Sequence, residues 1–160
     1  MTEVTLLDCT LRDGGYYTGW DFEPAFVGAY LSAMDASGIG ALEMGYRYLP
    51  RDMFLGAFAY CDDAYLQSLP LPTDMDIGIM VNAAELTAYS EGSVAAVNRL
   101  FTEANNSPVD FVRVAVHFAD ISSGEPICRR LTELGYRVTL NLMQTGNKTP
   151  EVLTQAAGVV

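Results

Sequence analysis

The sequence contains a single histidine, His117, among 160 residues. It has three cysteines, Cys9, Cys61 and Cys128, which are far apart and form no CxxC pair, so neither a zinc knuckle nor a disulfide framework is indicated. We expect reduced thiols that pack as small hydrophobic groups, as in a cytoplasmic protein. The shortage of nitrogen and sulfur ligands limits the metal sites that these residues can build by themselves.

Positive charge is also scarce, with nine lysines and arginines against twenty acidic residues and a net charge of −11. An acidic surface repels nucleic acids and anionic membranes, so we expect neither as a partner. The sequence has no signal-peptide pattern and no apolar run near the roughly 20 residues of a membrane span. It also has no GxGxxG or P-loop pattern after its first predicted strand, so nothing supports nucleotide binding.

What the sequence does contain is an alternation of strand-like and helix-like segments, with 50% hydrophobic residues and no internal linker. The predicted strands are Val4–Cys9, Ala41–Met44, Asp76–Val81, Asp110–Phe118 and Arg137–Met143, with the start of a sixth at 158–160. The predicted helices are Pro24–Ser37, Val94–Ala104, Glu125–Leu134 and one that begins at Pro150 with Thr149 as its N-cap. The stretch Gly45–Thr73 is expected to be a long loop with a short helix.

This alternation predicts an α/β fold with a parallel sheet. Two architectures are compatible with five or six strand–helix units: an open doubly wound sheet, and an eight-stranded barrel that needs about 250 residues. Hydrophobic periodicity does not choose between them.

The segment Leu6–Tyr16 is the most informative part of the chain, because a short apolar strand leads into Arg12-Asp13 and then into two glycines. A cation and a carboxylate before a glycine-rich turn suit a barrel active site. Asp13 is a candidate ligand for a divalent cation, and Arg12 is a candidate stabiliser of an oxyanion. Glu43, at the predicted end of the second strand, would face the same pocket. The alternative is a buried Arg–carboxylate pair that only braces the fold.

These residues carry a resemblance. The run Thr10–Gly14, preceded by Asp8, resembles the signature of the metal-dependent DRE-TIM, or HMG-CoA-lyase-like, superfamily, whose Asp-Arg-Glu pattern matches Asp13, Arg12 and Glu43. The segments Val112–His117 and Asn141–Met143 are similar to the fourth and fifth strands of 4-hydroxy-2-oxovalerate aldolases. The run Asp8–Tyr17 is most similar to aldolase-like proteins of bacterial polysaccharide gene clusters.

The resemblance implies a (β/α)₈ TIM barrel, of which residues 1–160 would be the N-terminal portion, with about five βα units and the start of strand six. It implies cleavage or formation of a C–C bond next to a 2-oxo acid, such as pyruvate, through a metal-bound enolate. Asp13 would ligate Mn²⁺ or Mg²⁺, and Arg12 would stabilise the enolate oxygen. The family takes its remaining metal ligands from a His-x-His pair on strand seven, which this sequence does not contain.

The family's histidine base corresponds here to Tyr16. A phenol with an ordinary pKa near 10 is a poor base at neutral pH, but it can donate a hydrogen bond to substrate. We therefore assign Arg12, Tyr16 and Glu43 as candidate catalytic residues, and Arg12, Asp13 and His117 as candidate substrate-binding residues. His117 is included because it ends the fourth strand on the expected catalytic face.

Other polar and aromatic side chains carry weaker signals. Arg47 and Arg51 are interpreted as solvated loop charges, with anion binding as the alternative. Asn141 and Gln144 near the end of the fifth strand are further candidates. An aromatic cluster, which we expect to pack rather than bind, consists of Tyr46, Tyr48, Phe54, Phe58, Tyr60 and Tyr65.

We therefore predict the N-terminal part of a divalent-metal-dependent, aldolase-like enzyme. Two alternatives stay open: an inactive scaffold or interaction domain, and an acyltransferase of the isopropylmalate synthase type. A partial barrel leaves unpaired strand edges, so we expect this chain to be a fragment of a longer protein, or to associate with itself or with a second chain that completes the barrel.

Overall fold

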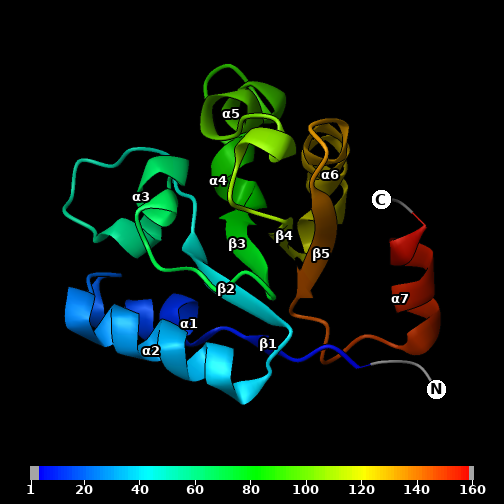
Figure 1. Ribbon diagram of the computed structural model, residues 1–160. Coiled ribbons are helices and arrows are strands. Elements are labelled where there is room, and N and C mark those ends of the chain that lie inside the picture. Colours follow the sequence, from blue (N-terminus) through cyan, green and yellow to red (C-terminus); the bar gives the residue numbers. More distant parts are fainter. Residues whose placement is uncertain (1–3, 159–160) are drawn as a thin grey trace.

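Five parallel strands form one sheet in the computed structural model, which describes residues 4–158 (Figure 1). The strands are β1 (Leu7–Asp8), β2 (Ala41–Tyr46), β3 (Asp76–Asn82), β4 (Phe111–His117) and β5 (Arg137–Met143). They are paired in the order in which they occur in the chain, β1-β2-β3-β4-β5. A doubly wound sheet reverses its strand order at a switch point, whereas a barrel adds each strand beside the last. The sheet curls as a half-barrel, so the barrel prediction is confirmed.

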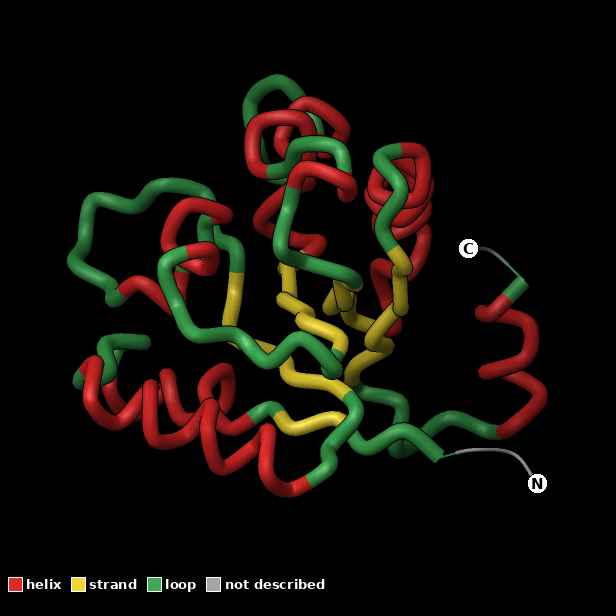
Figure 2. Tube along the Cα trace, in the orientation of Figure 1, coloured by secondary structure: helices red, strands yellow, loops and turns green. Residues whose placement is uncertain are grey.

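Helices lie around the outside of the curled sheet (Figures 1 and 2). They are α1 (Thr10–Thr18), α2 (Pro24–Ser37), α3 (Asp63–Gln67), α4 (Ala83–Thr87), α5 (Ser93–Leu100), α6 (Gly124–Glu133) and α7 (Pro150–Ala157). Short 3₁₀ turns occupy Ala57–Ala59, Ala104–Asn106 and Phe118–Ser123. No helix among residues 4–158 is both long and apolar enough to cross a membrane.

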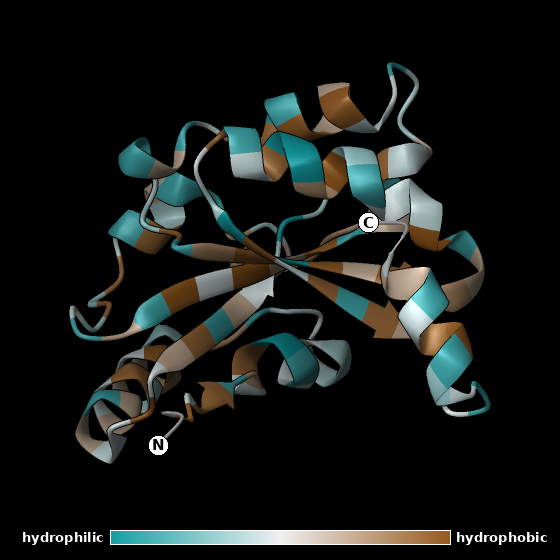
Figure 3. Ribbon diagram, turned by 90° about the vertical axis from the view of Figure 1, so that its right-hand side faces the viewer, coloured by the Kyte–Doolittle hydropathy of each residue, from teal (hydrophilic) through white to brown (hydrophobic). Residues whose placement is uncertain are grey.

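The central strands are buried on both faces, since every residue of β2 and five consecutive residues of β3 are buried. Leu42 on β2, Ile79 on β3 and Val114 on β4 point to the outer face and are fully buried. They form one core with helical residues such as Leu31 and Ile127. Hydrophobic residues are concentrated on the central strands, and hydrophilic ones appear more often on the helices (Figure 3). This outer layer buries one face of the sheet, and the opposite face carries both polar and apolar side chains.

Most predicted elements are confirmed, with small shifts at their ends. The prediction for α2 and β5 is exact, and Thr149 caps α7 by accepting a hydrogen bond from the Val152 amide. The predicted loop at 45–73 does contain a short helix, α3. The short helix α4 was not predicted. Residues 159–160 of the predicted sixth strand lie outside the described residues, and Gly158 follows the end of α7.

Two larger differences affect the site. The first strand, predicted as Val4–Cys9, is only Leu7–Asp8, and the expected glycine-rich turn after Arg12-Asp13 is helix α1. The second strand continues to Tyr46, so Glu43 lies in its middle and not at its end.

Candidate active site

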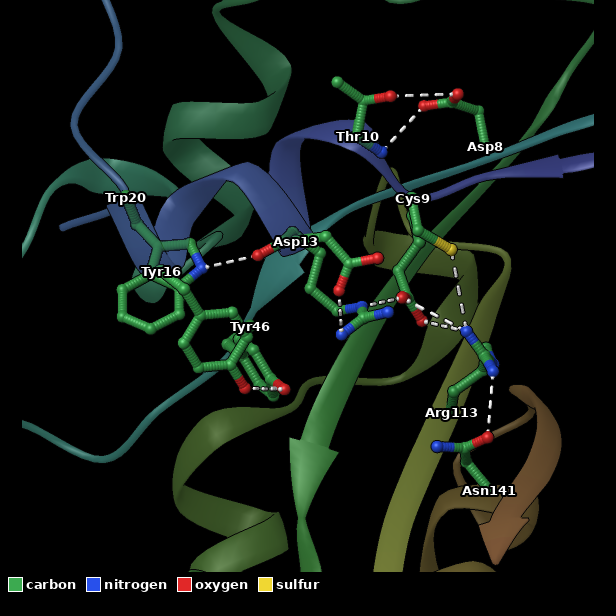
Figure 4. Close-up of polar contacts among 11 residues, drawn as sticks. Asp8, Cys9, Thr10, Asp13, Tyr16, Trp20, Tyr46, Arg113 and Asn141 are labelled. Atoms are coloured by element: carbon green, nitrogen blue, oxygen red, sulfur yellow. Dashed lines mark hydrogen bonds and ion pairs between the residues drawn. The ribbon is translucent and has the colours of Figure 1, made fainter. Parts of the chain in front are cut away.

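The chain leaves β1 at Asp8 and enters α1 two residues later, at Thr10 (Figure 4). The Asp8 carboxylate accepts hydrogen bonds from the Thr10 amide at 2.8 Å, the Thr10 hydroxyl at 3.0 Å and the Tyr30 hydroxyl of α2 at 2.5 Å. Burial by itself raises the pKa of Asp8, but the hydrogen bonds from Tyr30 and Thr10 outweigh it and lower that pKa below its ordinary value. Asp8 thus joins β1, α1 and α2 as a carboxylate.

Close packing, rather than a turn, explains the glycine at position 15. A Cβ atom there would lie 1.9 Å from the Trp20 side chain, so only glycine lets the indole lie against α1. The indole Nε1 donates a hydrogen bond of 3.0 Å to the Arg12 carbonyl. The helix then ends at Gly19, whose φ of 65° is in the left-handed region that favours glycine. The prediction of a glycine-rich turn is therefore wrong. The packing of Trp20 on Gly15 and its hydrogen bond to Arg12 stabilise a helix at these glycines.

Arg12 is held on two sides by carboxylates. Its Nε donates to Oε1 of Glu43, and its Nη1 lies 2.9 Å from Oδ1 of Asp13. The exposed fraction of the side chain is 15% for Arg12, 0% for Glu43 and 64% for Asp13. Arg12 thus pairs with one carboxylate in the interior and with another at the surface. Burial alone lowers the pKa of Arg12, but Glu43 and the other neighbours raise it above its ordinary value. The guanidinium therefore stays charged.

Glu43 also binds a second arginine, Arg113 from the middle of β4. Nη1 of Arg113 lies 3.2 Å and 3.1 Å from the two carboxylate oxygens, and its Nη2 donates to Oδ1 of Asn141 on β5 at 3.0 Å. Nη1 also lies 3.7 Å from the Cys9 sulfur, whose pKa is raised by burial and by Glu43. A polar network therefore runs across the inner face of the sheet from α1 to β5.

Tyr16 lies on the exposed side of this network. Its hydroxyl is 2.7 Å from the hydroxyl of Tyr46, the last residue of β2, and its ring meets the Trp20 ring edge to face at 4.9 Å. The guanidinium carbon of Arg12 lies 5.9 Å from the centre of the Tyr46 ring. Tyr16 is therefore placed near the predicted site residues.

His117 lies apart from them. It ends β4 on the same face as Arg113, but four residues further along the strand, or roughly 13 Å. Its Nδ1 is buried and has no hydrogen-bond partner among residues 4–158. The structure thus brings together Arg12, Asp13, Tyr16 and Glu43, and shows no hydrogen bond between this group and His117.

The donor set for a divalent cation is small. Among residues 4–158, no group of three or more histidine, cysteine, aspartate or glutamate side chains is arranged to hold a metal ion. Asp13 fits as one hard oxygen ligand, because its carboxylate is exposed beside Arg12. Glu43 does not fit, because both of its oxygens are used by arginines inside the fold. These residues provide one ligand and not a complete site.

Arg47 and Arg51 differ, although they are close in sequence. Arg47 is 3% exposed and its Nη2 donates to the Cys61 carbonyl and to Asp63, both at 2.6 Å, so its interpretation as a solvated loop charge is wrong. Arg51 is 37% exposed, and its Nη2 lies 3.2 Å from Glu85. The aromatic cluster packs as predicted at Tyr46, Tyr48 and Phe58, but not at Phe54, which is 82% exposed.

The sequence predicts no role for Arg113 and only packing for Tyr46. A signal for Arg113 was present in the sequence. A parallel strand that is buried on both faces is usually apolar throughout, and Arg113 is a lone arginine in the strand Phe-Val-Arg-Val-Ala-Val-His. Tyr46 had none, because only the fold places its hydroxyl next to that of Tyr16.

The pairing of each strand with the next defines the class of fold: the chain is a five-stranded α/β half-barrel that matches the N-terminal portion of an aldolase-type barrel. The most direct evidence is a crystal structure of the N-terminal domain of a candidate aldolase from Bacteroides vulgatus. It matches with a TM-score of 0.81 and 31% identity, over 95% of this chain and 49% of that one.

The relatives found by sequence agree with this class. The chain is 27% identical to 4-hydroxy-2-oxovalerate aldolases 2 and 4 of Rhodococcus opacus, over 97% of its own length and 43% of theirs. It is 24% identical to oxaloacetate decarboxylase of Mycobacterium tuberculosis, over 96% of its length and 43% of that protein. No sequence-family profile matches the chain. The chain is thus a distant homologue of these HMG-CoA-lyase-like enzymes and spans less than half of their length.

Proposed function

We propose that this chain supplies the N-terminal half of the active site of a carbon–carbon lyase that acts next to the carbonyl of a 2-oxo acid through an enolate. The observation that supports it best is the setting of Arg12. Its charged guanidinium lies largely buried between Glu43 and Asp13, directly after β1, where barrel enzymes hold their catalytic groups.

Arg12 has donors left for a substrate. A guanidinium carries five N–H groups, and Glu43 and Asp13 engage its Nε and Nη1, so the donors on Nη2 are available for an oxygen of the substrate. A cation in a partly buried, low-dielectric site stabilises the negative charge that develops on an enolate oxygen. Glu43 acts through Arg12 by keeping it oriented and charged.

A divalent cation, Mn²⁺ or Mg²⁺, would supply further positive charge at the substrate oxygens. Asp13 is the residue of this chain that would ligate it, through a carboxylate that is already exposed. Tyr16 would donate a hydrogen bond to a substrate oxygen, and His117, further along β4, would contact the more distant part of the substrate.

A second reaction uses the same chemistry. Loss of carbon dioxide from a 2-oxo acid with a carboxylate on C3 leaves the enolate that aldol cleavage also leaves. The similarity to oxaloacetate decarboxylase of Mycobacterium tuberculosis supports this candidate. Arg12 and Asp13 would have the same roles in both reactions.

The test is enolate formation by the full-length protein that contains this sequence. With pyruvate, Mn²⁺ and D₂O, we expect exchange of the methyl protons, followed by NMR. Arg12→Ala is expected to slow the exchange by about a hundredfold or more, the usual effect of removing an oxyanion stabiliser. Asp13→Ala is expected to slow it by a similar factor, because it removes the cation ligand that this chain would supply. Arg137→Ala is the matched control, because Arg137 pairs with Asp76 at 2.7 Å where β5 and β3 begin, whereas Arg12 follows the C-terminal end of β1.

Absence of exchange in the unmodified protein would contradict the proposal and favour a scaffold. Consumption of acetyl-CoA in the presence of a 2-oxo acid would point instead to an acyltransferase.

The same proposal includes what covers the edges of the sheet and where the protein is located. We propose that a further part of the barrel covers β1 and β5, from the same polypeptide, a second copy or another chain. The support is that β1 and β5 are the outermost strands of the described sheet, and that an apolar cavity of about 440 Å³ lies between β5, α6 and α7, lined by side chains that include Leu140 and Leu142. A cytoplasmic location is supported by three free cysteines.

A further inference from the structure

Two tyrosine hydroxyls lie 2.7 Å apart beside Arg12, and their surroundings differ sharply. Tyr46 is 5% exposed, whereas Tyr16 is 61% exposed. The Tyr46 ring stacks on Tyr48 at 4.6 Å and meets Trp20 edge to face at 5.7 Å. The buried Tyr46 ring is therefore fixed by packing, and the exposed Tyr16 phenol is hydrogen-bonded to the Tyr46 hydroxyl.

Physical chemistry favours one direction for this hydrogen bond. A buried O–H without an acceptor costs more than an exposed one, which can use water or substrate. The Tyr46 hydroxyl donates in no hydrogen bond of the described residues other than the one it shares with Tyr16. Tyr46 should thus donate to the Tyr16 oxygen, and this leaves the Tyr16 O–H free to point outward.

The raised pKa of Tyr46 agrees with its being a donor. Burial and the contact with Tyr16 raise the pKa of Tyr46 to about 12, although the Arg12 guanidinium opposes the rise. The Tyr46 hydroxyl consequently keeps its proton at neutral pH.

We propose that Tyr46 is a positioning residue, whose buried hydroxyl holds the Tyr16 phenol so that the Tyr16 O–H is presented to a substrate oxygen beside Arg12. The inference rests on the proposed function and adds to it a residue that the motif does not contain. Its substrate is a 2-oxo acid with a hydrogen-bond acceptor within reach of both Arg12 and Tyr16.

A double-mutant cycle in the full-length protein tests the inference, with pyruvate exchange in D₂O as the readout. Tyr46→Phe keeps the ring and its packing and removes only the hydroxyl. We expect Tyr16→Phe and Tyr46→Phe each to slow exchange by about tenfold, the value of one hydrogen bond, and the double variant to be no slower than Tyr16→Phe alone. Tyr48→Phe is the matched control, because it makes the same change in the same stack and leaves the Tyr16–Tyr46 bond in place.

A second readout does not need activity. With ¹³Cζ-labelled tyrosine, Tyr16→Phe should shift the Tyr46 resonance at neutral pH, because it removes the hydroxyl that contacts Tyr46 and keeps the ring. Tyr48→Phe should leave the Tyr46 resonance unchanged. An unchanged Tyr46 resonance, or additive effects in the cycle, would overturn the inference and leave the proposed function intact. No exchange by the unmodified protein would overturn the proposed function and the role of the pair together, whatever the resonances show.

Discussion

Glu43 is a carboxylate with no exposed side-chain surface, placed between Arg12 and Arg113. A buried charge is tolerated only when partners satisfy it, and removal of one partner leaves the others uncompensated. The two arginines reach Glu43 from α1 and β4, at sequence separations of 31 and 70 residues. This one side chain therefore links the start of the fold to its middle.

Glu43→Gln keeps the size of the side chain and removes its charge. We expect the free energy of unfolding to fall by about 3 kcal/mol, because two arginines lose their carboxylate, as measured by urea denaturation. Glu125→Gln is the control: that residue forms an exposed pair with Arg129 on α6, and its loss should cost less than about 0.5 kcal/mol. Equal losses in the two variants would show that Glu43 does not brace the site.

The same residues show how far a motif predicts a site. Arg12 and Asp13 are adjacent in the sequence, so their proximity was evident from the residues alone. The contact between Glu43 and Arg12 was expected from neighbouring strands and is present. Arg113 and Tyr46 were not assigned to the site, because their partners lie in other elements: strand register places Arg113 near Glu43, and the packing of α1 on β2 places Tyr16 near Tyr46.

Among the elements, α2 is attached to β1 through one polar contact, between Tyr30 and Asp8. The rest of the helix packs through apolar side chains such as Val27 and Leu31. Since β1 has only two residues, side-chain contacts of this kind help to define where the strand ends and α1 begins.

Tyr30→Phe tests this contact and its dependence on pH. The folded-state pKa of Asp8 lies below its ordinary value, so its contribution to stability is present above about pH 4 and is lost as the pH falls through the folded-state value. We expect the variant to lose about 1 kcal/mol of unfolding free energy at pH 7, and the difference to shrink towards pH 2. Tyr17→Phe, at a side chain that is 93% exposed, is the control. A loss that does not change with pH would mean that Asp8 is not the partner.

Elements also differ in how well the sequence predicts them. Arg137–Met143 and Pro24–Ser37 were predicted to the residue, because turn, capping and periodic signals agree at their ends. The first strand and α1 were not. Arg12-Asp13-Gly14-Gly15 has a weak intrinsic preference for helix, and contacts with Trp20 and Asp8 override it.

At the scale of the whole molecule, β1 and β5 are the edges of the sheet. The described ends of the chain lie on the same side of it, near these two strands (Figure 1). Val4 and Leu6, next to β1, are 80% and 63% exposed. Unpaired strand edges with exposed apolar residues favour association with another strand.

We therefore expect residues 1–160, expressed alone, to associate at micromolar concentration, as measured by light scattering after size exclusion. Leu6→Lys should reduce this association, because a charge beside an edge strand opposes pairing. Val94→Lys on α5 is the control, since Val94 is 41% exposed and lies away from both edges. A monomer, or the same effect from both variants, would contradict the covering of the edges that we propose.

The sequence by itself determined the alternation of strands and helices, the parallel sheet and the Arg12-Asp13 motif, because these depend on periodicity and on residues that are close in the chain. Its periodicity did not choose between an open sheet and a barrel, since both use the same local pattern, and only the resemblance of the motif implied the barrel. The tertiary structure confirmed the barrel through the pairing of each strand with the next. It also decided that Arg113 meets Glu43 and that Tyr46 meets Tyr16, because such contacts depend on register and on the curl of the sheet.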